Sequence, residues 1–253
     1  MRSGLAQRRQ RDTQKNELKP HLKKTWCIGQ INAAFLAQME RLLWLYSLPL
    51  DVRFPVVCFD ERPCFLIGDT VTALTLKAGS PRKEHYEYEK NGSCALLAAI
   101  EPQTGQRLAQ VYDHRRKREY ALFLKELAAR YPAAEKIRMV QDNLNTHNTS
   151  SLYETFPAAE AFALAQRFEF YYTPKKASWL NMQEIEFSAI ARQCLQRRIA
   201  TKAELEREVR AIVKERAAKA IKIEWQFSSA SARTKLNRHY ESVQAENVRY
   251  KET

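Results

Sequence analysis

The chain has 253 residues, 45% of them hydrophobic and 10% aromatic, which suits one large globular domain or a domain with an extension. Its charge is unusual, because 42 Lys and Arg against 29 Asp and Glu leave a net charge of +13. Such an excess indicates a polyanionic partner, either nucleic acid or an anionic membrane. No apolar run approaches the roughly 18 residues of a membrane span, and the basic N-terminus lacks the apolar stretch of a secretory signal. The composition therefore favours nucleic acid.

The cysteines are odd in number and widely spread, with no C-x-x-C pair and no His at zinc-finger spacing. This pattern predicts free thiols in a reduced, intracellular compartment, and we expect a cytoplasmic, nucleoid-associated protein. The five cysteines are Cys27, Cys58, Cys64, Cys94 and Cys194.

The first 24 residues are strongly basic, with eight Lys or Arg against Asp12 and Glu17. They are either a solvated tail or an arm that lies along phosphates. Residues 32–46 follow with the apolar spacing of a helix. These parts predict a basic connector and helix over residues 1–50.

Residues 56–59 form a short apolar run with β-branched and aromatic side chains, typical of a buried strand, and Asp60 follows directly. Pro63 predicts that this strand stops and that a second one, residues 64–67, pairs with it. Residues 77–91 are polar and indicate a loop or weak hairpin. Two further β-compatible runs flank the turn signal at 102–105, so we expect an antiparallel meander.

Helices and strands then alternate. The pattern predicts helices at 115–131, 178–199 and 202–220, a short helix from residue 150, and a basic helical stretch near 233–240. It predicts strands at 136–140 and 168–172. This order indicates an α/β fold, a mixed sheet flanked by helices with helical N- and C-terminal extensions. We expect a catalytic domain at 51–200 and a basic helical extension at 201–253.

The predicted helix at 178–199 carries two glutamates near its start. Glu184 borders the apolar stripe, because Phe187, Ala191 and Leu195 follow it at helical spacing. Glu186 is in phase with polar residues and is expected to face water. A carboxylate beside a core requires a cationic partner, either a metal ion or an arginine.

Asp60 and Asp142 each follow the last apolar residue of a predicted strand. If the two strands are parallel neighbours, both carboxylates emerge at one edge of the sheet, and Glu184 can reach them from the next helix. Oxygen-only ligands favour Mg²⁺ or Mn²⁺, and two such ions can drive phosphoryl transfer. The alternative is that these aspartates only form turns or cap helices.

Three segments resemble the catalytic blocks of insertion-sequence transposases of the mariner superfamily, closest to the bacterial branch named after insertion sequence six-thirty. They are CFDERP, QDNLNTH and TPKKASWLNMQEIEFS, which begin at Cys58, Gln141 and Thr173. The resemblance extends to residues 15–28 and to Trp225-Gln226-Phe227, so it covers most of the chain.

The resemblance implies a ribonuclease-H-like fold and a catalytic, metal-binding triad of Asp60, Asp142 and Glu184. It implies two Mg²⁺ or Mn²⁺ ions that cut DNA at transposon ends, strand transfer of the 3′ hydroxyl into target DNA, and a homodimer on paired ends. Family members carry an N-terminal helix-turn-helix region, and this chain begins within what resembles the connector after it. We therefore expect a catalytic domain without most of that region.

Other residues have two interpretations each. Asn143, His147 and Asn181 either fix the local backbone or support the triad. Glu61 is expected to be structural and Trp179 to pack in the core. The basic residues expected to contact DNA phosphates are Lys175, Lys176, Arg115, Arg116, Lys117 and Arg118. Two functional alternatives remain open: a nuclease of the same fold without strand transfer, and a DNA-binding remnant without activity.

Overall fold

The computed structural model describes residues 31–71, 85–244 and 247. The basic arm expected over residues 1–24, most of the connector and part of the loop expected at 77–91 lie outside the described residues. Within the described part of the chain, no helix is both long enough and apolar enough to cross a membrane.

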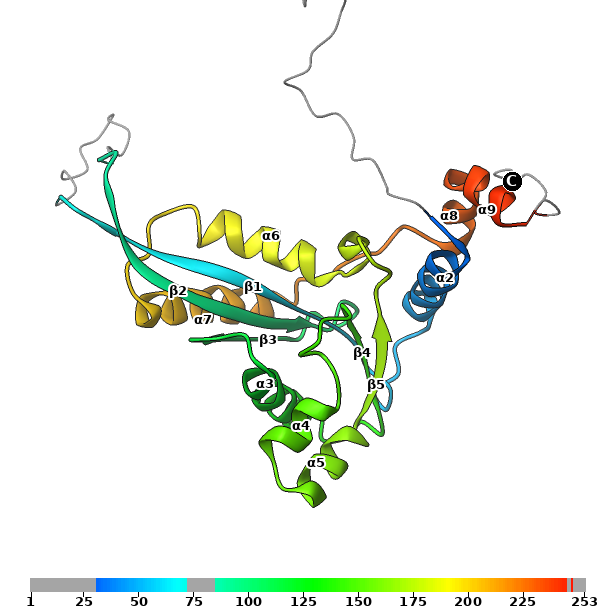
Figure 1. The fold of residues 1–253 in the computed structure, drawn as a ribbon, viewed down its shortest axis with the longest axis horizontal. Coiled ribbons are helices and arrows are strands. Elements are labelled where there is room, and N and C mark those ends of the chain that lie inside the picture. Colours follow the sequence, from blue (N-terminus) through cyan, green and yellow to red (C-terminus); the bar gives the residue numbers. More distant parts are fainter. Residues whose placement is uncertain (1–30, 72–84, 245–246, 248–253) are drawn as a thin grey trace, which may run out of the picture. The chain divides into compact units, whose positions relative to one another are not determined.

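One mixed sheet organises the described residues, in the order β3-β2-β1-β4-β5 (Figure 1). β1 pairs with β2 and β2 with β3 antiparallel, whereas β1 pairs with β4 and β4 with β5 in parallel. This confirms both the predicted meander and the parallel neighbours. The strands are β1 Val56–Asp69, β2 Tyr88–Ile100, β3 Arg107–Tyr112, β4 Ile137–Gln141 and β5 Phe168–Tyr172.

The helices lie close to where the apolar spacing predicted them, and α5 is an addition that the sequence did not indicate. They are α2 Ala33–Ser47, α3 Lys117–Arg130, α4 Ser150–Thr155, α5 Ala158–Ala165, the 3₁₀ turn η1 Ser178–Leu180, α6 Gln183–Gln193, α7 Lys202–Ala218, α8 Ser229–Lys235 and α9 Asn237–Val243.

Alternate residues of β1 and β2 face two separate apolar clusters, as the pleat of a strand requires. Val57 and Phe59 belong to the cluster that α3, α4 and α5 cover, whereas Cys64 and Leu66 belong to the cluster that α6 and α7 cover. Figure 1 shows α6 and α3 on opposite sides of the β1–β2 pair. The helices therefore cover both faces of the sheet, as predicted.

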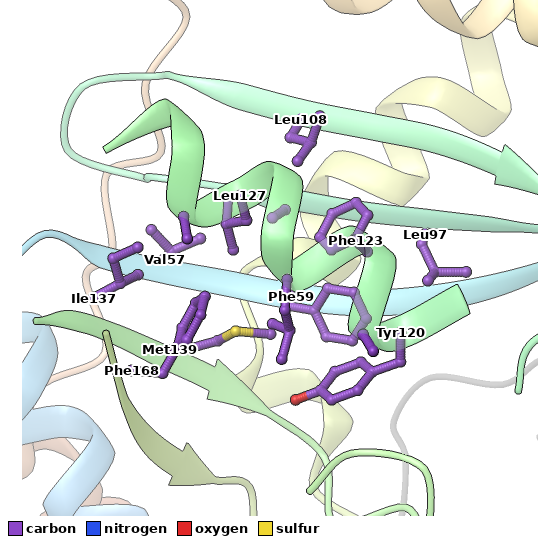
Figure 2. Close-up of a cluster of buried hydrophobic side chains, with 14 of the residues drawn as sticks. Val57, Phe59, Leu97, Leu108, Tyr120, Phe123, Leu127, Ile137, Met139 and Phe168 are labelled. Carbon is purple, nitrogen blue, oxygen red and sulfur yellow. The ribbon is translucent and has the colours of Figure 1, made fainter. Parts of the chain in front are cut away.

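Aromatic side chains fill the centre of the first cluster (Figure 2). The Phe59 ring lies 5.5 Å from that of Tyr120 and 5.1 Å from that of Phe123, centroid to centroid. All three side chains are buried, and each such burial stabilises the fold by roughly 1.5–3 kcal/mol. This packing holds rigid the part of β1 that precedes Asp60.

The prediction of two separate strands at 56–59 and 64–67 is wrong, because β1 runs without a break through Pro63. β4 pairs only with Val56–Cys58, so the following residues of β1 have a partner on one side only among the described strands. Proline, which has no N–H to donate, is tolerated where one strand edge is open.

The prediction of one helix over residues 178–199 is also wrong in its bounds. A 3₁₀ turn comes first, and α6 begins at Gln183 and ends at Gln193. Met182 occupies the N-cap position of α6, and no side chain caps it. Asn181, the polar residue expected to cap the helix, lies two residues before Gln183, and its side-chain oxygen accepts a hydrogen bond from the Gln183 N–H at 3.1 Å.

Candidate active site

Asp60 and Asp142 occupy equivalent places on neighbouring strands. β1 and β4 are parallel, and Cys58 pairs with Val140, so each aspartate lies two residues beyond this pair. Asp60 alternates with Phe59 and therefore points to the face of the sheet that α6 covers. The structure brings the two aspartates side by side, as the expected parallel pairing predicted. Only Asp142 follows the end of its strand, because β1 continues past Asp60 to Asp69.

Glu184 joins them from the first turn of α6. Burial raises the pKa of Asp60 to about 7, and the negative charges of Glu184 and Asp142 add to this effect, whereas the Glu61 N–H lowers it. Nearby carboxylates repel the charged form of Asp60, and a bound cation would relieve this repulsion. The three carboxylates therefore favour cation binding.

His147 is buried beside Asp142. Its Nδ1 atom lies 2.5 Å from Asp142 Oδ1, and its Nε2 atom lies 3.6 Å from Glu61 Oε2. The imidazole stacks on the Tyr120 ring and meets the Phe59 ring edge-on. Burial opposes a charge on His147, but the two carboxylates outweigh it and raise its pKa to about 9. His147 thus fixes the Asp142 carboxylate and neutralises part of its charge.

Asn181 ties the start of α6 to the strand that carries Asp60. Its Nδ2 atom donates a hydrogen bond to the Phe59 carbonyl oxygen at 2.7 Å and lies 3.4 Å from Asp60 Oδ2. The Glu184 N–H donates to the Asn181 carbonyl oxygen at 3.1 Å. Asn181 therefore contacts Asp60 through its side-chain amide and the Glu184 backbone through its own backbone carbonyl oxygen.

The expectation that Glu186 faces water is wrong. Glu186 is only 2% exposed, and its carboxylate pairs with Arg107 of β3 and Arg216 of α7. The helical spacing gave the wrong result because it predicts burial only from apolar residues on the same face of the helix. Glu186 is buried because two guanidiniums from distant segments of the chain pair with it. No local signal in the sequence marks that pairing. Glu184 itself is half-buried, in agreement with its predicted place at the border of the core.

The basic residues expected to contact DNA differ in their surroundings. Lys175 and Lys176 are exposed beside the start of α6, and within the described residues neither forms an ion pair. Arg115 lies 3.2 Å from Glu61, and Lys117 pairs with Glu154. The remaining two, Arg116 and Arg118, are exposed at the start of α3.

A shallow cavity of about 280 Å³ opens at Glu61 and the loop that follows Asp142. Arg115 lines it from one side, and Asn143 and Asn145 line it from the loop after β4. The prediction that Trp179 packs in the core is wrong, because its side chain is 39% exposed and meets the Phe227 ring edge-on. Asn143 and Trp179 are both exposed at the surface.

The carboxylates fit a hard divalent ion in their chemistry, since all their donor atoms are oxygens. In the described part of the chain, no three His, Cys, Asp or Glu side chains are grouped closely enough to hold one ion between them. Mg²⁺ is commonly held by one or two carboxylates, with water and phosphate oxygens completing its coordination. The open carboxylate cluster suits that second mode of binding.

The mixed five-stranded sheet flanked by helices is the ribonuclease-H-like fold. The model of the DDE superfamily endonucleases matches residues 55–206, more than half of the chain, and the chain belongs to this family. The matched residues include Asp60, Asp142 and Glu184. A search of curated proteins found no match.

Solved structures of similar fold include complexes of the Mos1 transposase. The paired-end complex with the left transposon end has a TM-score of 0.55 and 11% identity, covering 97% of this chain and 72% of that chain. The Mos1 mariner paired-end complex with Mn has a TM-score of 0.52 and 11% identity, and the match covers 94% of this chain and 72% of that chain. The Mos1 strand transfer complex has a TM-score of 0.51 and 13% identity, and the match covers 95% of this chain and 71% of that chain.

Proposed function

We propose that this chain is the catalytic domain of a DNA transposase of the mariner superfamily, of the bacterial branch named after insertion sequence six-thirty. The observation that carries the proposal is the placement of Asp60 and Asp142 side by side on the parallel strands β1 and β4, with Glu184 in the first turn of α6. Burial is the main cause of the raised pKa of Asp60, and the charges of Glu184 and Asp142 add to it. The net charge of +13 supports a phosphate polymer as the substrate.

Asp60, Asp142 and Glu184 would hold two Mg²⁺ or Mn²⁺ ions. When bound, such ions lower the pKa of the attacking water or hydroxyl and stabilise the leaving oxygen of the phosphodiester. Two neighbouring side chains would orient these carboxylates. His147 holds Asp142, and Asn181 holds the start of α6 against Asp60. Lys175 and Lys176 are placed to meet phosphates beside the cluster.

The same cluster would serve first cleavage at an element end and then attack of the exposed 3′ hydroxyl on target DNA. A homodimer on paired ends would bring two such sites together. The cytoplasmic, nucleoid-associated location and the domain boundaries at residues 50 and 200 stay predictions. The supporting role of Asn143 is likewise a proposal, carried by its place directly after Asp142 and in the cavity that Glu61 and Arg115 also line.

Replacing Asp142 by Asn tests the proposal. We expect loss of Mn²⁺-dependent nicking of a supercoiled plasmid, with DNA affinity equal to that of the unaltered protein or greater, because a negative charge near the phosphates is removed. Asp113→Asn is the matched control, since Asp113 pairs with Lys202 at the surface. Nicking that persists in Asp142→Asn would exclude the triad.

The second assay distinguishes a transposase from a nuclease of the same fold. An oligonucleotide duplex with a free 3′ hydroxyl end is incubated with plasmid, Mn²⁺ and the protein. Joined products are expected of a transposase, whereas cut plasmid without joined products identifies a nuclease. DNA binding without either product identifies an inactive DNA-binding remnant.

A further inference from the structure

The Glu186 carboxylate is held by two guanidiniums. Arg107 Nε and Arg216 Nε each donate a hydrogen bond to Glu186 Oε1 at 2.8 Å, and Arg216 Nη2 donates to Glu186 Oε2 at 3.0 Å. Glu186 is only 2% exposed, so these hydrogen bonds are shielded from water. The carboxylate is therefore buried, with both oxygens paired.

Arg107 is itself fixed by the backbone around it. Its Nη1 atom donates to the Gly105 carbonyl oxygen at 2.5 Å, and its Nη2 atom donates to the Ile221 carbonyl oxygen at 2.6 Å. The Ile223 N–H also donates to the Pro102 carbonyl oxygen at 3.0 Å. The segment after α7 thus crosses the turn between β2 and β3 and closes over Arg107.

Gly105 permits this close crossing. Its φ is +79°, and a Cβ atom at this position would lie 2.7 Å from the Ile221 carbonyl oxygen. Any side chain would push the segment away from Arg107. Glu186 is therefore held in place by one group of contacts, which we call the Glu186 support. It consists of Gly105, Arg107 and the segment through Ile221.

Glu184 lies between this support and a second one. Asn181, three residues earlier, is bonded to the Phe59 carbonyl oxygen of β1, and Glu186, two residues later, is bonded to β3 and α7. Neighbouring helical residues are rigidly related, with a rise of about 1.5 Å each. Any rotation of α6 that moved Glu184 would break the bonds of Glu186.

We propose that Glu186 is the positioning residue that fixes the rotation of α6 and so places Glu184 against Asp60 for metal binding. The proposal rests on the proposed function, because it assigns Glu184 to the metal site. It also makes α7 and the segment through Ile221 part of the support of that site. The further consequence is that metal affinity depends on contacts made outside the carboxylate cluster.

Mn²⁺ binding tests this role without requiring turnover. The protein is titrated with Mn²⁺, and free Mn²⁺ is measured by electron paramagnetic resonance, for the unaltered chain, Glu186→Gln, Glu184→Gln and Glu40→Gln. We expect Glu186→Gln to weaken Mn²⁺ binding by about ten-fold, the lower range for residues that orient metal ligands. Glu40 is the matched control, because it pairs with Arg233 at 2.7 Å, between α2 and α8.

A purely structural role for Glu186 predicts a different result. In that case Glu186→Gln and Glu40→Gln lower the melting temperature but leave Mn²⁺ affinity unchanged, and the positioning role is overturned. If Glu186→Gln does not fold, Arg216→Lys replaces it: this variant keeps the charge but loses the two-pronged contact, and it should weaken Mn²⁺ binding in the same direction. Unchanged affinity in a folded Arg216→Lys would equally overturn the proposal.

The two proposals fail in different ways. If the unaltered protein binds no Mn²⁺, or if Glu184→Gln binds it as tightly, the proposed metal site is wrong. If Glu184→Gln loses binding and Glu186→Gln retains it, the metal site stands and only the positioning role is wrong.

Discussion

The Asn181 side-chain amide lies 3.4 Å from an Asp60 carboxylate oxygen and donates a hydrogen bond to the Phe59 carbonyl oxygen at 2.7 Å. Asn181 and Phe59 are buried, so water cannot replace the hydrogen bond between them, whereas Asp60 is partly exposed. The contact joins β1 to the start of α6, two elements that are more than 100 residues apart in sequence. The Asn181 contact thus connects the strand that carries Asp60 with the helix that carries Glu184.

Removal of the Asn181 side-chain amide should lower the stability of the fold. We expect Asn181→Ala to lower the free energy of unfolding by about 1–3 kcal/mol, because the buried Phe59 carbonyl oxygen loses its donor. Urea denaturation at neutral pH measures the loss. Asn91→Ala is the control, since the Asn91 amide donates to the Ala200 carbonyl oxygen at 3.1 Å at the surface. An equal loss in both variants would contradict a special role for Asn181.

The Glu186 cluster should make stability fall in acid. Its folded pKa is lowered below the ordinary value of 4.5, so its contribution is present above pH 4.5 and is lost as pH falls through the lowered folded value. At pH 7, Glu186→Gln should cost about 3–5 kcal/mol, because two buried guanidiniums lose their counter-charge. Urea denaturation at pH 7, 5 and 3 should show a smaller difference between the two proteins at the lowest pH.

Two outcomes would contradict this account of Glu186. A difference that stays constant from pH 7 to pH 3 would show that the carboxylate charge does not contribute. A difference that grows in acid would have the wrong sign for a lowered pKa.

Lys176 has a left-handed backbone, with φ at 62°, in the loop that leads to α6. Non-glycine residues there are strained, so Lys176→Gly should be more stable than Lys176→Ala by about 1 kcal/mol. Both variants lose the charge, and both should reduce the salt dependence of DNA binding by about one phosphate contact. Thermal unfolding gives the stability, and fluorescence anisotropy at several salt concentrations gives the slope.

Lys175→Ala provides the comparison for Lys176, because it removes a neighbouring charge from a residue that does not have this backbone conformation. Equal stability of Lys176→Gly and Lys176→Ala would show that the left-handed backbone is not a source of strain. An unchanged salt slope in all three variants would exclude this loop from the DNA interface.

Substitutions at Gly105 and Gly92 distinguish two causes of lost stability, backbone strain and steric crowding of an added side chain. Both have positive φ, at +79° and +108°, but a Cβ atom meets the Ile221 carbonyl oxygen at Gly105 and nothing within 4 Å at Gly92. We expect Gly92→Ala to cost about 1 kcal/mol for its backbone alone and Gly105→Ala to cost distinctly more. Thermal unfolding of both variants measures the difference. Equal losses would mean that the segment at Ile221 moves aside freely.

Much of the architecture could be predicted from the apolar pattern. Periodicity located α2, α3, β4 and β5 almost to the residue, because each has one buried face and clear ends. It failed at Pro63, where an open strand edge accepts a proline that would break a strand paired on both sides. It also failed for the end of α6, where the apolar spacing continues beyond the last helical residue.

The sequence by itself determined which acidic residues follow the apolar runs, and so it predicted that Asp60 and Asp142 lie side by side on parallel strands. Local periodicity is sufficient to locate the apolar runs, although it did not show that β1 continues past Asp60. Only the tertiary structure decided the place of Glu186. Its partners Arg107 and Arg216 are 79 and 30 residues away, and the free energy of a buried ion pair depends on the distance between charges in space, not along the chain.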